Sequence, residues 1–212
     1  MIEIIYEGRL GNHLFQYGRA LIDHLELGHS ISNLSPEIAE TNIIKLFPQH
    51  EDGKEKVVQE GYFQDDDTIN KFKKYKKILF NDPSPRDGLF VHVRLGDTIT
   101  PFGLLHYSYA PQEYYERAID QLNVTTGFIS SDRPDHTIVQ NLIKKYNLEL
   151  YQDTPDNTII FGSRFSNKVL SLGTYSWWIG FLGNDNNITT PIYHDYKEWH
   201  PNFYKDMGWH SI

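Results

Sequence analysis

Apolar residues in the second half of the chain occur either in short runs or at helical spacing, and the two patterns alternate. The short runs predict strands at 89–94, 127–130, 148–152, 168–172 and 188–193. The helical spacing predicts helices at 111–122, 137–146 and 174–182. Because strands and helices alternate with short turns, we expect a doubly wound α/β fold around a mostly parallel sheet.

The first half begins with the apolar run 2–6, which predicts a strand, followed by a glycine-bearing turn. A helix at 13–27 is expected next, since Leu14, Tyr17, Leu21 and Leu25 recur at helical spacing. We further predict a helix at 36–47, a short strand at 56–60 and a polar helix at 67–79. The segment 81–88 contains two prolines and a glycine and is the best candidate for a linker. It divides the chain into an α/β half at 1–82 and a second half at 83–212.

The composition narrows the class of protein. With 212 residues, of which 39% are hydrophobic and 14% aromatic, the chain can form one large domain or two small ones. The net charge of −8 argues against nucleic-acid binding, and we interpret the one basic cluster, 71–77, as the exposed face of a helix. Absence of cysteine excludes disulfides, thiolate metal sites and a thiol nucleophile. No leader-like or membrane-spanning pattern is present in the sequence, so we expect a soluble, cytoplasmic protein without a transmembrane segment.

Polar or glycine-bearing segments follow four of the predicted strands. They are "GRLGN" at 8–12, "RLGD" at 94–97, "SSDRPD" at 130–135 and "SLGTYS" at 171–176. Ligands of open parallel sheets bind at the carboxyl ends of the strands. We therefore expect these segments to line a common crevice if the two halves face each other.

Arg94 and Asp97 stand three positions apart at the end of a predicted strand. An arginine in a crevice can hold a diphosphate through two hydrogen bonds, and a nearby aspartate can accept a proton from an attacking hydroxyl. Spacing alone allows an equally simple interpretation, in which the two side chains only pair with each other.

Gly173, Thr174 and Ser176 are placed where a helix should begin. The amides and hydroxyls of a helix start can bind an anion, helped by the helix dipole. The alternative is that a serine or threonine serves as an ordinary N-cap and that Trp177 and Trp178 belong to the core.

The remaining motifs are weaker. The turn 7–12 lacks the glycine pattern of dinucleotide folds and the Lys-Ser/Thr of a P-loop, so Gly8 and Gly11 could merely permit the turn, and Asn12 could cap the helix or face a ligand. Asp65 and Asp67 could hold a divalent metal, although we favour their role as dipole partners of the following helix. Three histidines are spaced too irregularly for a metal site: His194, His200 and His210.

Considered together, several stretches resemble the inverting α-1,2-fucosyltransferases, glycosyltransferase family eleven. They are "GRLGNHLFQYGRAL" at 8–21, "EGYFQ" at 60–64, "VHVRLGD" at 91–97, "FISSD" at 128–132 and "LSLGTYSWWIGFLG" at 170–183. The resemblance implies a GT-B architecture with two facing Rossmann-type halves. It implies that GDP-fucose binds mainly to the second half and the acceptor to a trimmed first half, with no metal or other cofactor.

The resemblance also implies roles for individual residues. Arg94 falls at the position of an arginine on the donor β-phosphate, and His92 at that of a histidine beside the guanine. The full donor-binding set expected is Gly11, Asn12, His92, Arg94, Ser130, Asp132, Thr158, Gly173, Thr174, Tyr175 and Ser176. Arg9, His13 and His106 are expected as acceptor-binding or auxiliary residues.

The sequence departs from the family pattern at identifiable positions. Leu95 stands where a second arginine is usual, and His13 replaces a glutamine. Thr158 stands where relatives often carry an acidic residue for the nucleobase, with Asp156 and Asn157 just upstream.

The resemblance therefore predicts an enzyme of glycan biosynthesis that transfers L-fucose from GDP-fucose, with inversion, to a hydroxyl of an oligosaccharide. Asp97 is the expected general base, with His13 and His106 as alternatives. Two rival functions stay open: a metal-dependent transferase using Asp65, Asp67 and another nucleotide sugar, and a carbohydrate-binding module with Tyr and Trp surfaces. A dinucleotide oxidoreductase is less well supported, because the glycine fingerprint is missing.

Overall fold

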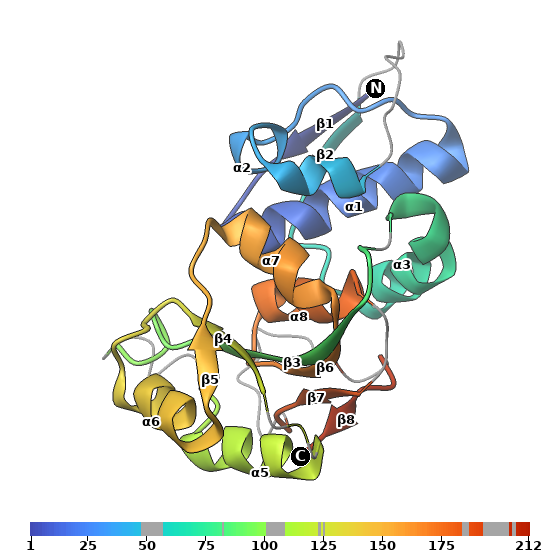
Figure 1. Ribbon diagram of the computed structural model, residues 1–212. Coiled ribbons are helices and arrows are strands. Elements are labelled where there is room, and N and C mark those ends of the chain that lie inside the picture. Colours follow the sequence, from blue (N-terminus) through green and yellow to red (C-terminus); the bar gives the residue numbers. More distant parts are fainter. Residues whose placement is uncertain are drawn as a thin grey trace. The chain divides into compact units, whose positions relative to one another are not determined.

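A computed structural model describes the protein at residues 1–47, 57–81, 83–100, 109–122, 124, 126–183, 187–192, 204 and 207–212. The chain divides into two compact units, Met1–Asp82 and Pro83–Ile212, with the bounds expected from the proline-rich segment. Figure 1 draws the first unit in blue to cyan-green and the second in green to red. None of the helices in the described ranges is both long enough and apolar enough to cross a membrane.

The first unit is built on a two-stranded parallel sheet. Strand β1 (Ile2–Ile5) pairs with β2 (Val57–Glu60) in the register Ile2 to Val57. The helices of this unit are α1 (Leu10–Leu27), α2 (Pro36–Ala39) and α3 (Asp66–Leu79), with a 3₁₀ helix η1 (Asn42–Leu46) after α2. Its core is aromatic, since the rings of Phe15, Tyr17, Phe47, Phe72 and Phe80 form successive contacts.

The single helix predicted at 36–47 is wrong in the structure, because α2 ends after Ala39. Thr41 has an extended backbone with φ −121° and ψ 164°. Its hydroxyl donates to the carbonyl oxygens of Glu37 and Ile38, at 3.0 and 3.1 Å. A threonine that binds the preceding turn in this way competes with helix continuation.

The second unit contains a six-stranded parallel sheet in the order β5-β4-β3-β6-β7-β8. The strands are β3 (Arg86–Val93), β4 (Gly127–Ser131), β5 (Leu148–Leu150), β6 (Phe165–Val169), β7 (Ile188–Thr190) and β8 (His210–Ser211). The helices are α5 (Gln112–Leu122), α6 (Thr137–Tyr146), α7 (Pro155–Ser163) and α8 (Thr174–Phe181). This topology confirms the expected α/β class with a parallel sheet and is compatible with a Rossmann-like fold.

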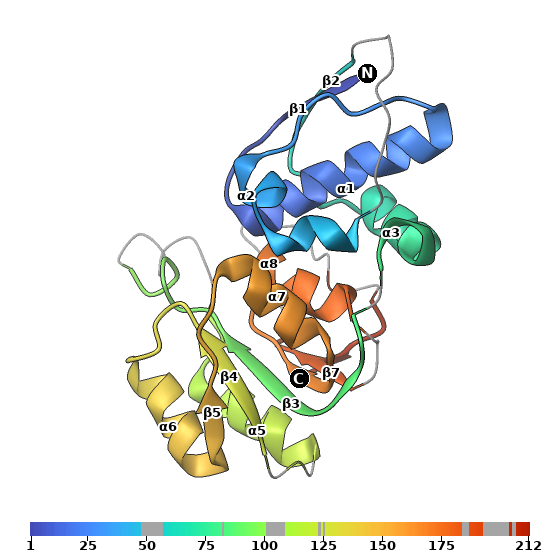
Figure 2. The same cartoon turned by 45° about the horizontal axis from the view of Figure 1, so that its top comes forward.

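Helices cover both faces of the sheet in the second unit. Figures 1 and 2 show α5 and α6 on one face and α7 and α8 on the other. The first face is aliphatic, with Val91, Val93 and Ile129 packed against the helices. The second is aromatic, and α7 lies so close to the sheet that a Cβ added at Gly162 would overlap the ring of Phe90. Leu89 and Val91 of β3 face the first core and Phe90 faces the second, which explains the apolar run at 89–91.

Strand β3 begins at Arg86, three residues before the predicted start at 89. The guanidinium of Arg86 lies over the rings of Phe128 and Phe165, at 4.7 and 4.9 Å from their centroids. Cation–π contact lets a charged residue begin a strand whose interior is apolar. Part of the predicted linker, 86–88, therefore belongs to the sheet.

Candidate functional site

Three of the four polar segments lie at one edge of the parallel sheet of the second unit. Strand β3 lies between β4 and β6, with Val93 opposite Ser131 and Val91 opposite Val169. Segments 94–97 and 171–176 come after β3 and β6, and segment 130–135 begins with the last two residues of β4, so the three are neighbours at the carboxyl edge. The fourth segment, 8–12, follows β1 in the other unit.

Arg94 links the segment after β3 to the one after β6. Its Nη2 donates to both carboxylate oxygens of Asp97, each at 3.1 Å. A Cβ added at Gly173 would overlap Nη1 of the same guanidinium, which therefore lies against the backbone at the start of α8. The pairing expected from the simpler interpretation is present, and so is the meeting of Arg94 with the helix start. Both side chains are partly open to solvent, at 25% for Arg94 and 35% for Asp97.

Helix α8 begins after a glycine. Gly173 is the cap residue, with φ 108° and ψ 160°, and Thr174 is the first helical residue. The alternative of an ordinary Ser or Thr N-cap is thus wrong, whereas the expected burial of Trp177 and Trp178 is confirmed, at 0% exposure each. Because the cap has no side chain, the guanidinium of Arg94 can approach the first turn closely.

His92 belongs to a buried cluster beside this helix. Its Nδ1 lies 2.7 Å from the Ser176 hydroxyl, and its ring lies 5.0 Å from the ring of Tyr175. Burial lowers the pKa of His92 to about 4, so the imidazole is neutral at physiological pH. The Tyr175 hydroxyl donates to the Pro155 carbonyl at 2.6 Å and is hydrogen-bonded to Thr158. The structure thereby brings His92, Thr158, Tyr175 and Ser176 together.

Asp132 and Ser130 come from β4 and its carboxyl end. Ser130 is buried and is the register partner of His92. The carboxylate of Asp132 accepts hydrogen bonds from the backbone amides of Leu95 and Gly96, at 2.8 and 3.0 Å. Leu95, which precedes Gly96 in this turn, is fully buried in the aliphatic core.

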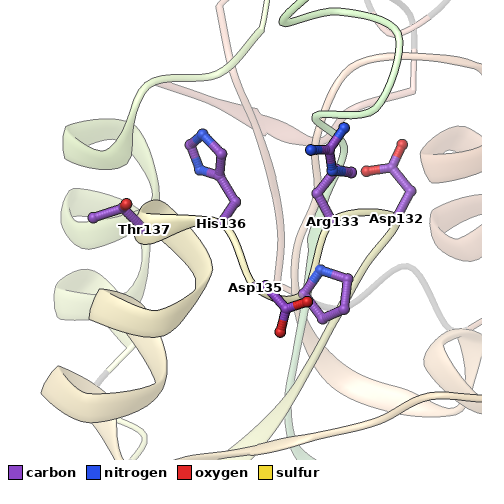
Figure 3. A pocket seen from close by; sticks show the side chains of 6 residues that line it. Asp132, Arg133, Asp135, His136 and Thr137 are labelled. Atoms are coloured by element: carbon purple, nitrogen blue, oxygen red, sulfur yellow. The ribbon is translucent and has the colours of Figure 1, made fainter.

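A surface hollow of about 500 Å³ lies where β4 leads into α6. It is lined by the continuous segment Asp132, Arg133, Pro134, Asp135, His136 and Thr137. Figure 3 shows the carboxylates of Asp132 and Asp135 pointing away from each other in this segment. The hollow is thus formed by one loop, and of its lining residues Asp132 is the one bonded to the 94–97 segment.

The candidates in the first unit surround the start of α1. Arg9 is its exposed cap residue, and Gly11 is buried within its first turn. The Asn12 side chain lies against Gly8 and accepts from the Gln64 amide at 3.2 Å, so it does not cap the helix.

His13 is buried rather than open to solvent, with 8% of its surface exposed. Its Nδ1 lies 3.1 Å from the hydroxyl of Ser35 and 3.7 Å from the carboxylate of Glu37, and its ring contacts that of Tyr6. His106, His194 and His200 lie outside the described residues.

Asp65 and Asp67 serve α3, as the favoured interpretation predicts. Asp65 is the N-cap and accepts from the Thr68 amide at 2.8 Å. Asp67, in the first turn, pairs with Arg19 at 2.9 Å and with Lys71 at 3.5 Å. Within the described ranges no group of three or more His, Asp or Glu side chains is placed to hold a metal ion.

Comparisons with protein-family models, with curated proteins and with solved structures gave no match to this chain. The class of protein is accordingly defined by the topology: an α/β protein whose second unit is a parallel sheet with helices on both faces. Its candidate site is the carboxyl edge that carries Arg94, Asp132 and the start of α8.

Sequence reasoning missed two features of this site. The carboxylate of Asp132 binds the backbone amides of Leu95 and Gly96, although the family resemblance implied a contact with the nucleotide sugar. Thr158 lies on α7, a helix that the sequence did not predict. Pro155 and the preceding Thr154 were an available signal for its start, since proline favours the first helical position.

The stability of the protein should depend on pH through His92. An unfolded histidine has a pKa near 6.5 and the folded one about 4, so between these values the unfolded state binds more protons. The stabilising contribution is therefore complete above pH 6.5 and is lost as the pH falls toward 4. We expect the free energy of unfolding to decrease by about 2 kcal/mol from pH 7 to pH 5 through this group.

Urea unfolding at both pH values, with His92→Gln as the non-titrating comparison, measures this contribution. The variant should lose less stability than the wild-type protein over the same interval. Equal losses in the two proteins would show that another group is responsible.

Proposed function

We propose that the protein is an inverting glycosyltransferase that moves L-fucose from GDP-fucose to a hydroxyl of an acceptor glycan, forming an α-1,2 linkage without a metal ion. The observation that carries this proposal is the position of the Arg94 guanidinium against Gly173, at the start of α8. A fixed cation beside a helix N-terminus is an arrangement suited to a diphosphate. The two elements come from sequence segments that independently resemble the donor-binding motifs of the family.

The reaction would be a single displacement at the anomeric carbon. A bond forms between the acceptor oxygen and this carbon, while the bond from the carbon to the diphosphate oxygen breaks on the opposite side. The leaving diphosphate gains negative charge, which Arg94 and the amides at the start of α8 would stabilise. Arginine stays charged at any relevant pH, and donors aimed at developing charge typically contribute roughly 3–4 kcal/mol to lowering the barrier.

Asp97 is our candidate for the general base that takes the proton of the acceptor hydroxyl. In the free protein it is paired with Arg94, and a nearby cation favours the ionised carboxylate. When the diphosphate attracts the guanidinium, Asp97 loses part of this stabilisation and becomes more basic. The donor would then activate the base as it binds. His13 and His106 stay as predicted alternatives.

The guanine would meet Tyr175 before His92. His92 is 6% exposed, and the Tyr175 ring, which is more open, contacts it. We infer that the guanine stacks on the ring of Tyr175. Neutral His92 contacts the same ring and is held in place by its hydrogen bond to Ser176. An aromatic ring stacks on any base, so this contact gives affinity rather than selectivity.

Two observations weaken the rival functions. A carbohydrate-binding module with a tryptophan surface is disfavoured, because Trp177, Trp178 and Trp209 in the described ranges are all buried, although Tyr62 and Tyr109 are exposed. A metal-dependent transferase would need Asp65 and Asp67, whose carboxylates are engaged by the α3 amide and by Arg19.

The direct test is to incubate the purified protein with a panel of GDP- and UDP-linked sugars and to measure release of the nucleoside diphosphate. We expect slow hydrolysis of GDP-fucose without acceptor, unchanged by EDTA, and faster release when a suitable glycan is added. Loss of activity in EDTA would favour the metal-dependent rival. Calorimetry that detects no binding of GDP would refute the proposal and favour a binding module.

A further inference from the structure

The loop that carries Arg94 is fastened at two neighbouring positions. Leu95 is fully buried in the aliphatic core of the second unit. The amides of Leu95 and Gly96 donate to Oδ1 and Oδ2 of Asp132, so each oxygen of one carboxylate holds one amide. Hydrogen bonds to an ionised acceptor are shorter and stronger than those between neutral groups. We call this contact the Asp132 clamp.

The Asp132 clamp requires a glycine at position 96. A Cβ added at Gly96 would lie 2.5 Å from Oδ2 of Asp132, which is closer than non-bonded atoms can come. A glycine is therefore needed for the carboxylate to reach both amides. The close approach of the Asp132 carboxylate to the backbone thus explains the glycine in "RLGD".

The sheet brings the two partners together. Strands β3 and β4 are parallel neighbours with Val93 opposite Ser131, so Arg94 and Asp132 are the next residues on each strand. Asp132 thus lies beside the loop at the point where the chain leaves the sheet. Arg94, the residue before the clamped amides, is directed to Asp97 and Gly173.

From these contacts we propose that Asp132 is a positioning residue that holds the 94–97 loop so that Arg94 stays over the start of α8 before the diphosphate arrives. The inference rests on the proposed function and revises the expectation that Asp132 contacts the donor itself. A carboxylate directed at a diphosphate would repel it. With both oxygens bound to amides, Asp132 instead fixes the cation in place, so little of the binding free energy is lost in ordering the loop.

The test compares two substitutions that break the clamp in different ways. Asp132→Ala removes both acceptor oxygens, and Gly96→Ala keeps the negative charge but displaces the carboxylate. Asp135→Ala is the matched control, because it removes an exposed carboxylate of the same loop. We expect both clamp variants to bind GDP about tenfold more weakly in calorimetry, because part of the binding free energy is then lost in ordering the loop and Arg94. The control should bind as the wild-type protein does.

A second measurement reads the clamp without any ligand. In the free protein the Gly96 amide proton should resonate downfield in NMR spectra, because it donates to a carboxylate oxygen of Asp132. The signal should move upfield in Asp132→Ala and stay in Asp135→Ala. Asp132→Asn, which keeps one acceptor oxygen, should give intermediate GDP affinity and replaces Asp132→Ala if that variant does not fold.

The outcomes separate this inference from the function on which it rests. If Arg94→Ala weakens GDP binding and the clamp variants bind GDP normally, the positioning role is wrong and the proposed function stands. A Gly96 signal that does not respond to Asp132→Ala also overturns the inference. If the wild-type protein does not bind GDP, the proposed function fails and the inference fails with it.

Discussion

Replacing Arg94 by alanine is expected to reduce fucose transfer by roughly 10²–10³-fold, the usual effect of removing one donor aimed at developing negative charge. The guanidinium is a quarter exposed and pairs with the partly exposed Asp97, so the fold should tolerate the change. Both kcat and the affinity for GDP should fall, because Arg94 would bind the diphosphate before and during the reaction. Steady-state kinetics with GDP-fucose and calorimetry with GDP measure the two effects.

Two further variants make this result specific to Arg94. Arg94→Lys keeps the charge but loses the planar fork, and it should recover only part of the activity. Arg133→Ala removes an exposed cation two positions after the end of β4 and should leave transfer unchanged. Near-normal transfer by Arg94→Ala, with its thermal unfolding unaltered, would refute the role of this residue.

Gly173→Ala should damage stability and GDP binding together. The backbone at Gly173, with φ 108° and ψ 160°, is in a region that other residues scarcely adopt, and strain of this kind costs about 1–3 kcal/mol. The added methyl group would also overlap Nη1 of Arg94 and drive the guanidinium off the start of α8. We expect a lower free energy of unfolding and, in the protein that remains folded, GDP binding at least tenfold weaker.

A second variant, Gly208→Ala, distinguishes the effect of backbone strain from the effect of displacing Arg94. Gly208 also has a positive φ, 72°, but a Cβ there meets no atom of the described residues within 4 Å. This variant should lose some stability and keep its affinity for GDP. Urea unfolding and calorimetry on both variants provide the comparison. If Gly173→Ala binds GDP as tightly as Gly208→Ala does, then GDP binding does not depend on the position of Arg94 beside α8.

Much of the second unit could be predicted because its elements carry strong local signals. Helix α6 has the predicted bounds, since residues 137–146 have clear helical spacing between a turn and Asn147, whose backbone is left-handed. The beginning of α8 was also predicted, because Gly173 and the following hydroxyl residues are typical of a helix start. These same signals placed three polar segments at one edge of the sheet.

Helix α7 could not be read from hydrophobic spacing. Its buried residues include Asp156, Thr158 and Ser163 together with Ile159, so polar and apolar side chains share the covered face. The predicted strand at 168–172 was misplaced for a related reason, because β6 begins at Phe165 and its serine and asparagine obscure the apolar pattern.

The contacts that define the candidate site depend on tertiary structure. Arg94 and Gly173 are far apart in the sequence, and they meet because β3 and β6 are neighbours in the sheet. The partners of Asp132 are backbone amides, which every residue except proline carries, so no residue type in the sequence marks them. The sequence therefore indicated a functional site at this edge of the sheet. Which residues pair with one another there could be learned only from the tertiary structure.

The pair formed by Arg94 and Asp97 has a consequence for turnover. An arginine with a carboxylate partner must exchange that partner for the diphosphate, so the nucleotide binds less tightly than the charge alone would allow. After transfer the exchange can run in reverse, with Asp97 competing against spent GDP for the guanidinium. In the proposed reaction this internal competitor shortens the residence time of the product and limits product inhibition.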